Sequence, residues 1–245
     1  MKKNKRKIII GIISIVVLII LMTIGFGLKF KYETSKMKPL ETQEIISGIY
    51  AIKNDYVNFY VIKKEKGYIV IDAGVSLKDS ENELSKLGIN EEDVTDVFLT
   101  HTDYDHSAVL KLFKNATVYI SEQEEQMINK KTHRQMMGYN KLEVPYKTVK
   151  DGEKIKTINR EVQGILTPGH TPGSMSYLVD GKYLFTGDTL SLNKGKVERF
   201  NTFFNMDSKQ QEASLHQLAD TEPAEYIFTG HYGYTNDYVA AFEKW

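Results

Sequence analysis

Four short apolar segments of this 245-residue chain end in the same way, with a threonine followed within a few residues by a histidine or an aspartate. Residues 97–99 precede Thr100 and His101, residues 165–166 precede Thr167 and His170, residues 183–185 precede Thr186 and Asp188, and residues 227–228 precede Thr229 and His231. Strands that leave a core at one rim can direct the residues after them toward a common point. The pattern therefore predicts a layered sheet structure whose strand ends share one site.

The densest part of this pattern is VFLTHTDYDHSAV, at residues 97–109. Crowding the imidazoles of His101 and His106 with the carboxylates of Asp103 and Asp105 is costly unless a positive charge lies among them. A loop that caps a following helix through Asp105 would explain one of these four residues. The chain has no cysteine, so a metal site must be built from His, Asp and Glu. Four of the six histidines belong to the pattern.

The rest of the body alternates strand and helix patterns. Residues 57–62 and 68–71 are typical of paired strands, residues 77–87 of a helix ended by Gly88, and residues 117–120 of a strand before a polar helix over 121–130. Residues 176–179 and 182–185 flank Asp180 and Gly181, a two-residue hairpin signal. Residues 210–218 and 239–244 are typical of helices. This mixture predicts an α/β domain built in layers.

Residues 8–28 form a separate feature, because these 21 residues carry no charge and follow a cluster of five basic residues. About 20 apolar residues, rising 1.5 Å each, cross a hydrocarbon layer of roughly 30 Å. A cleaved signal peptide has a shorter apolar region and an A-x-A-like cleavage site, which does not follow here. We expect a basic tail and transmembrane anchor over 1–28, a linker over 29–44 and one domain over 45–245. The basic N-terminus favours a single-pass protein of the cell membrane with an extracytoplasmic body.

Charge is divided unevenly along the chain. Residues 1–38 hold nine Lys or Arg against Glu33, a balance of +8, so the remaining 207 residues of this formally neutral chain sum to −8. Nucleic-acid binding needs a basic surface, which an acidic body does not provide. We therefore expect a small-molecule substrate, a membrane contact through residues 8–28 and no nucleic acid, with the oligomeric state left open.

Taken together, H-x-D-x-D-H at 101–106, T-P-G-H-T-P-G at 167–173, T-G-D at 186–188 and T-G-H at 229–231 resemble the metallo-β-lactamase superfamily. Asn58 and the sequence I-D-A-G at 71–74 resemble the opening hairpin and turn of that family. The resemblance runs from about residue 49 to His231. It implies a four-layer αβ/βα sandwich with a two-metal hydrolytic site at one edge, preceded here by the transmembrane helix.

The resemblance also implies a role for each motif residue. The first metal ion would be held by His101, Asp103 and His170, and the second by Asp105, His106 and His231, with Asp188 bridging both ions and Asp72 orienting a ligand. The two divalent ions, zinc foremost, would generate a hydroxide near neutral pH. Asp105 would also transfer a proton as a catalytic residue. The implied enzyme is a metal-dependent hydrolase of an ester, thioester, lactone, amide or phosphodiester bond, with a pattern closer to thioester and lactone hydrolases.

Asp103 departs from the usual family motif, H-x-H-x-D-H. A third carboxylate lowers the charge of a core of two ions and one hydroxide from about +1 to zero, which raises the pKa of the bound water. Carboxylate oxygen also shifts the preference toward iron or manganese. Two outcomes stay open: Asp103 binds the first ion, or the short side chain falls short and leaves that site weak.

Two other functions follow from the same departure. Flavodiiron proteins of the superfamily carry Glu at this position, so a diiron redox protein acting on oxygen or nitric oxide is one alternative. Such proteins need an electron supply, normally a fused flavin domain, which we do not expect in this chain. A catalytically inactive metal-binding sensor domain is the other alternative, and the presence of every other ligand position argues against it.

Residues outside these motifs are weaker candidates. Arg199 and Phe203, in the segment after Asp188, are candidate substrate contacts; for Phe203 and its neighbours Phe200, Phe204 and Met206, core packing is the simpler interpretation. His133 and His216 lack the strand-end context and are expected at the surface or in packing. Met136 and Met137 are expected to fill gaps in the core.

Overall fold

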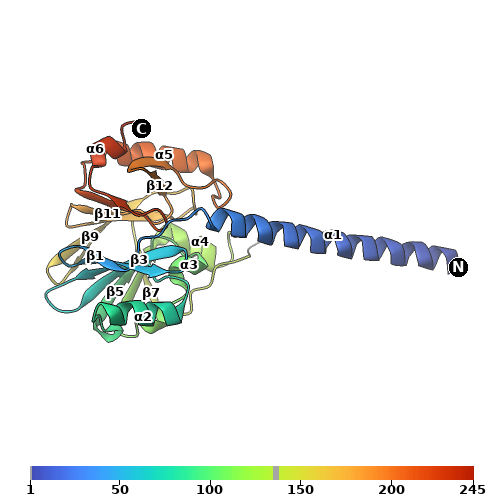
Figure 1. Ribbon diagram of the computed structural model, residues 1–245, viewed down its shortest axis with the longest axis horizontal. Coiled ribbons are helices and arrows are strands. Elements are labelled where there is room, and N and C mark those ends of the chain that lie inside the picture. Colours follow the sequence, from blue (N-terminus) through green and yellow to red (C-terminus); the bar gives the residue numbers. More distant parts are fainter. Residues whose placement is uncertain (1, 135–137) are drawn as a thin grey trace. The chain divides into compact units, whose positions relative to one another are not determined.

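The computed structural model describes residues 2–134 and 138–245, and the chain divides into two compact units, Met1–Met37 and Lys38–Trp245 (Figure 1). Met136 and Met137, expected in the core, lie outside the described residues.

The first unit consists almost entirely of helix α1 (Lys2–Thr34). Among the described residues it is the one helix long and apolar enough to cross a membrane, over Lys5–Thr34, with a mean hydropathy of 3.1. The helix continues beyond Leu28, so residues 29–34, expected in a polar linker, are helical. The reason is local: neither Gly nor Pro interrupts these residues, and Lys29 and Glu33 form an ion pair one helical turn apart.

In the described part of the second unit, one sheet has seven strands whose spatial order follows the chain. They are β1 (Gln43–Ile46), β2 (Ile49–Asn54), β3 (Val57–Lys63), β4 (Tyr68–Ile71), β5 (Val94–Phe98), β6 (Thr117–Ser121) and β7 (Tyr146–Val149). Strands β1 to β4 pair antiparallel, and β4 to β7 pair parallel. The hairpin of β3 and β4 confirms the pairing expected for residues 57–62 and 68–71.

A second sheet has six strands in the described part of the chain, in the order β15-β14-β11-β10-β9-β8. They are β15 (Tyr234–Thr235), β14 (Tyr226–Phe228), β11 (Tyr183–Phe185), β10 (Met175–Val179), β9 (Arg160–Leu166) and β8 (Lys154–Thr157). Only β11 and β14 pair parallel within it. Asp180 and Gly181 both have positive φ, 54° and 68°, as a tight β10–β11 hairpin requires. A separate hairpin joins β12 (Leu190–Asn193) to β13 (Lys196–Arg199).

The helices of this unit are α2 (Leu77–Lys86), α3 (Tyr104–Ser107), α4 (Glu125–Ile128), α5 (Ser208–Ala219) and α6 (Tyr238–Ala241). The Ser76 hydroxyl caps α2 and the Asp207 carboxylate caps α5, each accepting from backbone N–H groups of the first turn. The expectation of one helix over 121–130 was wrong in length. Those residues form a 3₁₀ turn and the four-residue α4, with Glu124 fully buried rather than on a solvated face.

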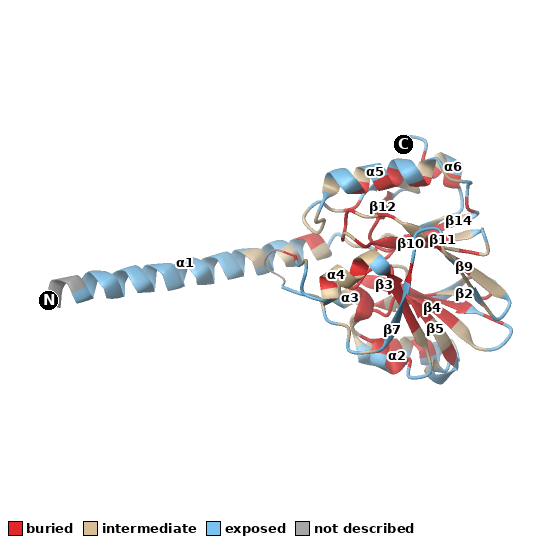
Figure 2. Ribbon diagram, turned by 180° about the vertical axis from the view of Figure 1, so that it is seen from behind, coloured by how far each residue is buried: buried red, intermediate tan, exposed pale blue. Residues whose placement is uncertain are grey.

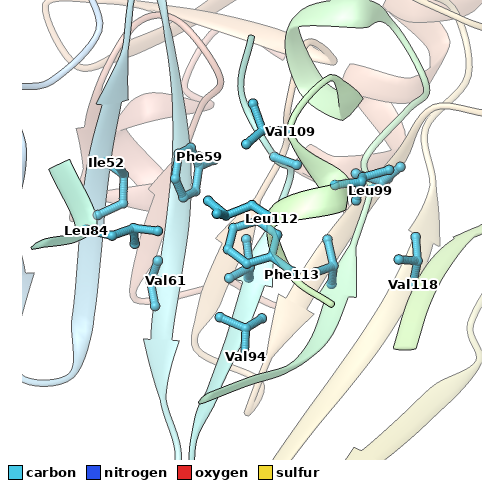
Figure 3. Close-up of a cluster of buried hydrophobic side chains, with 14 of the residues drawn as sticks. Ile52, Phe59, Val61, Leu84, Val94, Leu99, Val109, Leu112, Phe113 and Val118 are labelled. Atoms are coloured by element: carbon cyan, nitrogen blue, oxygen red, sulfur yellow. The ribbon is translucent and has the colours of Figure 1, made fainter. Parts of the chain in front are cut away.

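Three apolar clusters separate the four layers. Because successive strand residues point to opposite faces, Phe59 and Val61 of β3 pack with Leu84 of α2 (Figure 3). Tyr60 and Ile62 of the same strand face the second sheet. A third cluster joins the second sheet to α5 and α6 through residues such as Leu215. Buried positions accordingly concentrate in the strands, while the helices expose their outer faces (Figure 2). The body is an α/β four-layer αβ/βα sandwich.

Two buried tyrosines connect the sheets through their hydroxyl groups. Tyr60 of the first sheet donates to the carbonyl of Thr229, 2.7 Å away beyond β14 of the second sheet. Tyr177 of the second sheet donates to the carbonyl of Leu99, 3.1 Å away beyond β5 of the first sheet. Each accepting carbonyl lies two residues before a histidine of the strand-end pattern, His231 or His101. These two hydrogen bonds therefore fix the positions at which the site loops leave the two sheets.

We predict that Tyr60→Phe and Tyr177→Phe each lower the free energy of unfolding of residues 38–245 by about 1–2 kcal/mol, because each leaves a buried carbonyl without its donor. Urea unfolding followed by circular dichroism measures this loss. Tyr183→Phe is the matched control, because Tyr183 is only partly buried and its described contact is with the Tyr226 ring. Equal stability of all three variants and the parent would contradict the prediction.

Candidate metal centre

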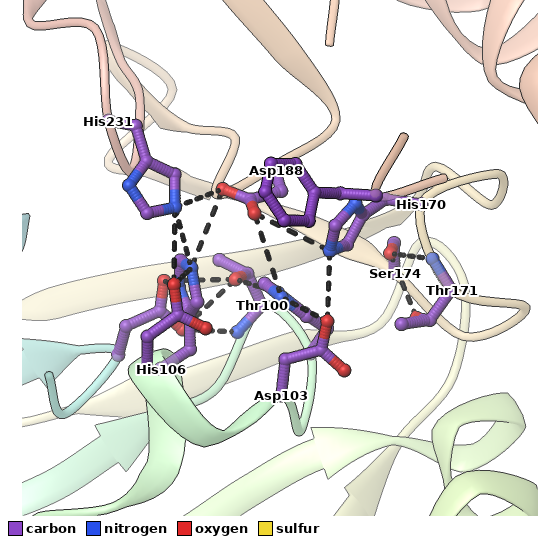
Figure 4. Close-up of polar contacts among 12 residues, drawn as sticks. Thr100, Asp103, His106, His170, Thr171, Ser174, Asp188 and His231 are labelled. Carbon is purple, nitrogen blue, oxygen red and sulfur yellow. Dashed lines mark hydrogen bonds and ion pairs between the residues drawn. The ribbon is translucent and has the colours of Figure 1, made fainter. Parts of the chain in front are cut away.

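The seven predicted ligand residues come together at one edge of the sandwich, at the ends of four strands (Figure 4). The segment after β5 in the first sheet carries four of them: His101, Asp103, Asp105 and His106. The other three follow strands of the second sheet: His170 after β9, Asp188 after β11 and His231 after β14. The site therefore forms only when the two sheets pack against each other.

The loop of His170 needs glycine on both sides because other backbone segments approach it closely. A Cβ on Gly169 would lie 2.3 Å from the backbone nitrogen of Gln211 in α5, and Gly169 has a φ of +140°. A Cβ on Gly173 would lie 2.1 Å from the backbone nitrogen of Glu124. The motif T-P-G-H-T-P-G thus holds His170 between two fixed pieces of backbone.

Each clustered histidine points Nε2 inward and has a partner for Nδ1. His106 Nδ1 lies 2.9 Å from Asp72 Oδ2, and His231 Nδ1 lies 2.7 Å from the backbone oxygen of Tyr56. For the other two histidines, the Nδ1 partners are Thr100 Oγ1 at 3.0 Å from His101 and Asn205 Oδ1 at 3.3 Å from His170. With Nδ1 donating in this way, each Nε2 presents its lone pair to the cluster.

Asp72, expected to orient a ligand, accepts more than the His106 hydrogen bond. Its carboxylate also accepts from the backbone N–H of Thr100 at 2.8 Å and from the Thr100 hydroxyl at 2.9 Å. Asp72 itself has a φ of 63°, a conformation that costs energy in a residue other than glycine. The carboxylate of this residue thereby connects to His106 directly and to His101 through Thr100.

Four donor atoms form a compact group at Asp105, His106, Asp188 and His231. His231 Nε2 lies 3.2 Å from Asp188 Oδ1, 3.3 Å from His106 Nε2 and 3.5 Å from Asp105 Oδ2. His106 Nε2 lies 3.5 Å from Asp188 Oδ1 and 3.8 Å from Asp105 Oδ2. Ligands about 2.0–2.1 Å from a tetrahedral zinc ion are about 3.3 Å apart, so this group fits such an ion.

A second group contains His101, Asp103, His170 and the other oxygen of Asp188. His170 Nε2 lies 3.1 Å from Asp103 Oδ2 and 3.4 Å from Asp188 Oδ2, while His101 Nε2 lies 3.6 Å from Asp103 Oδ2. Here a protein cation is already present: Nη2 of Arg134 lies 2.7 Å from Asp103 Oδ2 and 2.9 Å from His170 Nε2. The sequence analysis did not identify this arginine, which lies in a polar run.

The electrostatics of the cluster favour added positive charge. Burial alone would lower the pKa of His106, but the surrounding carboxylates, Asp188 foremost, hold it well above its usual value. Burial would raise the pKa of Asp188, yet the neighbouring histidines, His231 foremost, hold it well below its usual value. Burial lowers the pKa of His101, and the nearby His106 and His170 lower it further.

Two buried atoms within the cluster make no hydrogen bond to any described residue: His101 Nε2 and Asp188 Oδ1. Unpaired buried polar atoms are costly, and here both face other metal-capable donors. These atoms, the inward Nε2 lone pairs and the donor spacings together show that the His/Asp clusters fit a divalent metal ion.

Glu124 is a further residue that the sequence analysis missed. Its buried carboxylate accepts from the backbone N–H and hydroxyl of Thr102, both at 2.8 Å, and from the Thr171 hydroxyl at 2.6 Å. It thus joins the loop beside His101 to the loop beside His170. Burial raises its pKa to about 7, against the hydrogen bonds, which lower it.

The remaining candidates lie outside the cluster. Arg199 is exposed on β13 and pairs with Glu212, 3.1 Å away. Phe203 packs against Phe204, with ring centroids 4.9 Å apart. Phe200 contacts two histidines of the cluster, since its ring lies 5.1 Å from His170 and 5.8 Å from His231, and the Tyr56 ring stacks on His231 at 5.9 Å. His216 lies on α5 and contacts the backbone oxygen of Trp245, away from the strand ends, and the His133 ring lies against Tyr139.

We predict that the free energy of unfolding of metal-free residues 38–245 falls, relative to that of Glu124→Gln, as pH rises from about 4.5 to 7. The pKa of Glu124 is about 7 in the folded chain and about 4.3 when unfolded. Between these values the folded state binds more protons, so stability decreases with pH, by up to about 3 kcal/mol. Urea unfolding across this range tests the prediction, and a difference that does not vary with pH would contradict it.

Comparison with known proteins agrees with this arrangement. Residues 52–231 match the family model of the metallo-β-lactamase superfamily. A probable metallo-hydrolase of Methanocaldococcus jannaschii is 31% identical over 169 residues, 67% of this chain and 71% of the relative. A hydroxyacylglutathione hydrolase of Buchnera aphidicola is 32% identical over 66% of this chain and 58% of the relative. A probable polyketide biosynthesis zinc-dependent hydrolase of Bacillus subtilis is 32% identical over 58% of this chain and 60% of the relative.

Solved structures show the same fold. A metallo-β-lactamase family protein of Thermus thermophilus superposes with a TM-score of 0.65 at 20% identity, covering 82% of this chain and 79% of that one. A subclass B3 metallo-β-lactamase of Bradyrhizobium japonicum superposes with a TM-score of 0.62 at 21% identity, covering 80% and 79%. From the family match over most of the body, the shared fold and the gathered His and Asp residues, we conclude that this chain belongs to the metallo-β-lactamase superfamily of metal-dependent hydrolases.

Proposed function

We propose that this chain is a membrane-anchored hydrolase of small thioesters, esters or lactones, with zinc as its resident ion and iron or manganese as the alternatives that Asp103 favours. The observation that carries the proposal is the convergence of seven His and Asp side chains from two sheets, with every clustered imidazole presenting Nε2. The assignment of the His and Asp residues as ligands of the ion is part of the same proposal.

Different residues of the chain bind the ion, orient its ligands and transfer a proton. A divalent ion at this centre would supply Lewis-acid polarisation and lower the pKa of water beside it. His106, His231, Asp105 and Asp188 would hold the ion, and Asp72 keeps His106 in the tautomer that presents Nε2. The side chain of Asp105 is 19% exposed, whereas the Asp188 side chain is 5% exposed. Asp105 therefore reaches the solvent side of the cluster, where it can take a proton or deliver one to a leaving group.

The substrate class rests on three observations. Two relatives that cover more than half of this chain are described as a hydroxyacylglutathione hydrolase and a probable polyketide biosynthesis zinc-dependent hydrolase. The likeness to them supports an acyl substrate for this chain. The buried ring of Phe200 packs against both His170 and His231, so the protein surroundings of these two histidines are apolar rather than charged on that side. The acidic body does not suit a polyanionic substrate.

Membrane anchoring through residues 8–28 is supported by the apolar length of α1. The helix has 33 residues, and nearly all of its large apolar side chains from Ile8 to Leu28 are exposed along the apolar run. An exposed apolar surface of this length is costly in water and favourable in a bilayer. The denser basic cluster at the N-terminus supports an extracytoplasmic body.

We predict that Asp188→Ala and His170→Ala each reduce kcat/KM for thioester or lactone hydrolysis by about two or more orders of magnitude, because each removes a buried member of the centre. The assay uses the zinc-loaded chain and a panel of acyl thioesters, esters and lactones. His216→Ala is the matched control, because His216 is exposed on α5 and contacts Trp245. Turnover in Asp188→Ala equal to that of the parent would refute the proposed chemistry.

We further predict that the full chain sediments with membranes after an alkaline carbonate wash, whereas residues 38–245 alone stay in the supernatant, because α1 carries the continuous exposed apolar run while the exposed apolar residues of the body are scattered singly. Mass spectrometry of the membrane-bound form should find residues 8–28 still attached. A mature chain that begins after residue 28 would show instead that these residues are a cleaved signal.

A further inference from the structure

Arg134 is a buried arginine whose described hydrogen bonds all lie at or beside the first metal position. Its side chain is 8% exposed. Nε donates to Asp103 Oδ1 at 3.2 Å and Nη2 to Asp103 Oδ2 at 2.7 Å, so the guanidinium grips the carboxylate with two nitrogens. Nη2 also contacts His170 Nε2 at 2.9 Å and the His170 backbone oxygen at 3.0 Å, and Nη1 donates to the backbone oxygen of Phe204.

These contacts use the atoms that an ion at the first position would need. An N–H donor 2.9 Å from His170 Nε2 engages the lone pair of that nitrogen. A zinc ion would have to lie about 2.0 Å from the same nitrogen. The guanidinium and the ion therefore exclude each other at this position. Asn140 strengthens the arrangement, since its Nδ2 donates to Asp103 Oδ1 at 2.9 Å.

The charge balance points the same way. The cluster contains three carboxylates, on Asp103, Asp105 and Asp188, and the guanidinium of Arg134 neutralises one of them at close range. One divalent ion at the group of Asp105, His106, Asp188 and His231 balances the remaining two. A second ion would leave a buried excess of positive charge next to a guanidinium that has no other carboxylate within the described contacts.

We propose that Arg134 takes the place of the first metal ion, so that the centre holds a single divalent ion at Asp105, His106, Asp188 and His231. This inference rests on the proposed function and departs from the two-ion centre that the family resemblance implies. Arg134 acts as a positioning residue: its nitrogens are engaged by Asp103, His170 and Phe204, and it fixes the charge and geometry beside the ion. Asp103, which stands where the family motif has a histidine, and Arg134 then act together. The carboxylate binds the guanidinium, and the guanidinium occupies the place of the first ion.

The test is a count of bound ions in the full chain, purified in detergent, stripped with a chelator, reloaded with excess zinc and passed through a desalting column. Mass spectrometry of the metal should find about one zinc per chain. A parallel titration with cobalt(II), followed by its visible d–d absorption, should saturate at about one equivalent. The double variant Asp103→His with Arg134→Gln provides three histidines at the first position and should raise both values to about two.

Two control variants separate the outcomes. Arg160→Gln removes another guanidinium that is paired with a carboxylate, that of Asp180 at 2.6 Å, and should leave the count at about one. His231→Ala should reduce it to near zero. Two tightly bound ions in the parent chain, or one ion in the double variant, would overturn the role of Arg134 while leaving the proposed hydrolase intact. No bound ion in the parent would defeat the proposed function itself. The parent count decides the matter even if the double variant fails to fold.

Discussion

Burial of three carboxylates in one place is the constraint on which the rest of this structure depends. Asp103, Asp105 and Asp188 lie within a cluster of largely buried side chains, and desolvation opposes their ionisation. Burial raises the pKa of Asp105, with the neighbouring Asp188 adding to that effect against the histidines around it. Asp103 is different: although burial would raise its pKa, Arg134 and His170 hold it well below its usual range. Arg134 thus compensates the negative charge of Asp103. The charges of Asp105 and Asp188 have no such guanidinium partner among the described residues, which favours a cation from solution.

The architecture serves this cluster by fixing the two sheets against each other. Each sheet alternates apolar residues toward the shared core, and the hydroxyls of Tyr60 and Tyr177 cross that core in opposite directions. Both hydroxyls end on carbonyls directly before the site loops, so the same contacts that stabilise the fold set the spacing of the donor atoms. Glu124 provides a third connection, at the level of the loops themselves.

Much of this could be predicted from the sequence because its signals are local. Strand-end motifs, hairpin residues and the gathering of seven His and Asp residues depend on spacing that is visible in one dimension, and the structure places them accordingly. Arg134 and Glu124 could not be found this way. Both lie in polar runs that suggest a solvated surface, and only the folding of distant loops over them gives each a buried partner. The one available signal for Arg134 was indirect: a carboxylate in place of a histidine at position 103 requires a nearby cation.

The division of the donor set between the sheets has a consequence for how the protein matures. Neither half of the sandwich carries a complete site: His101 and His106 come from the earlier half of the chain, and Asp188 and His231 from the later half. Under the proposed function, the full set of donors for an ion exists only after both halves have docked. An ion held there would join the two sheets and so stabilise their interface.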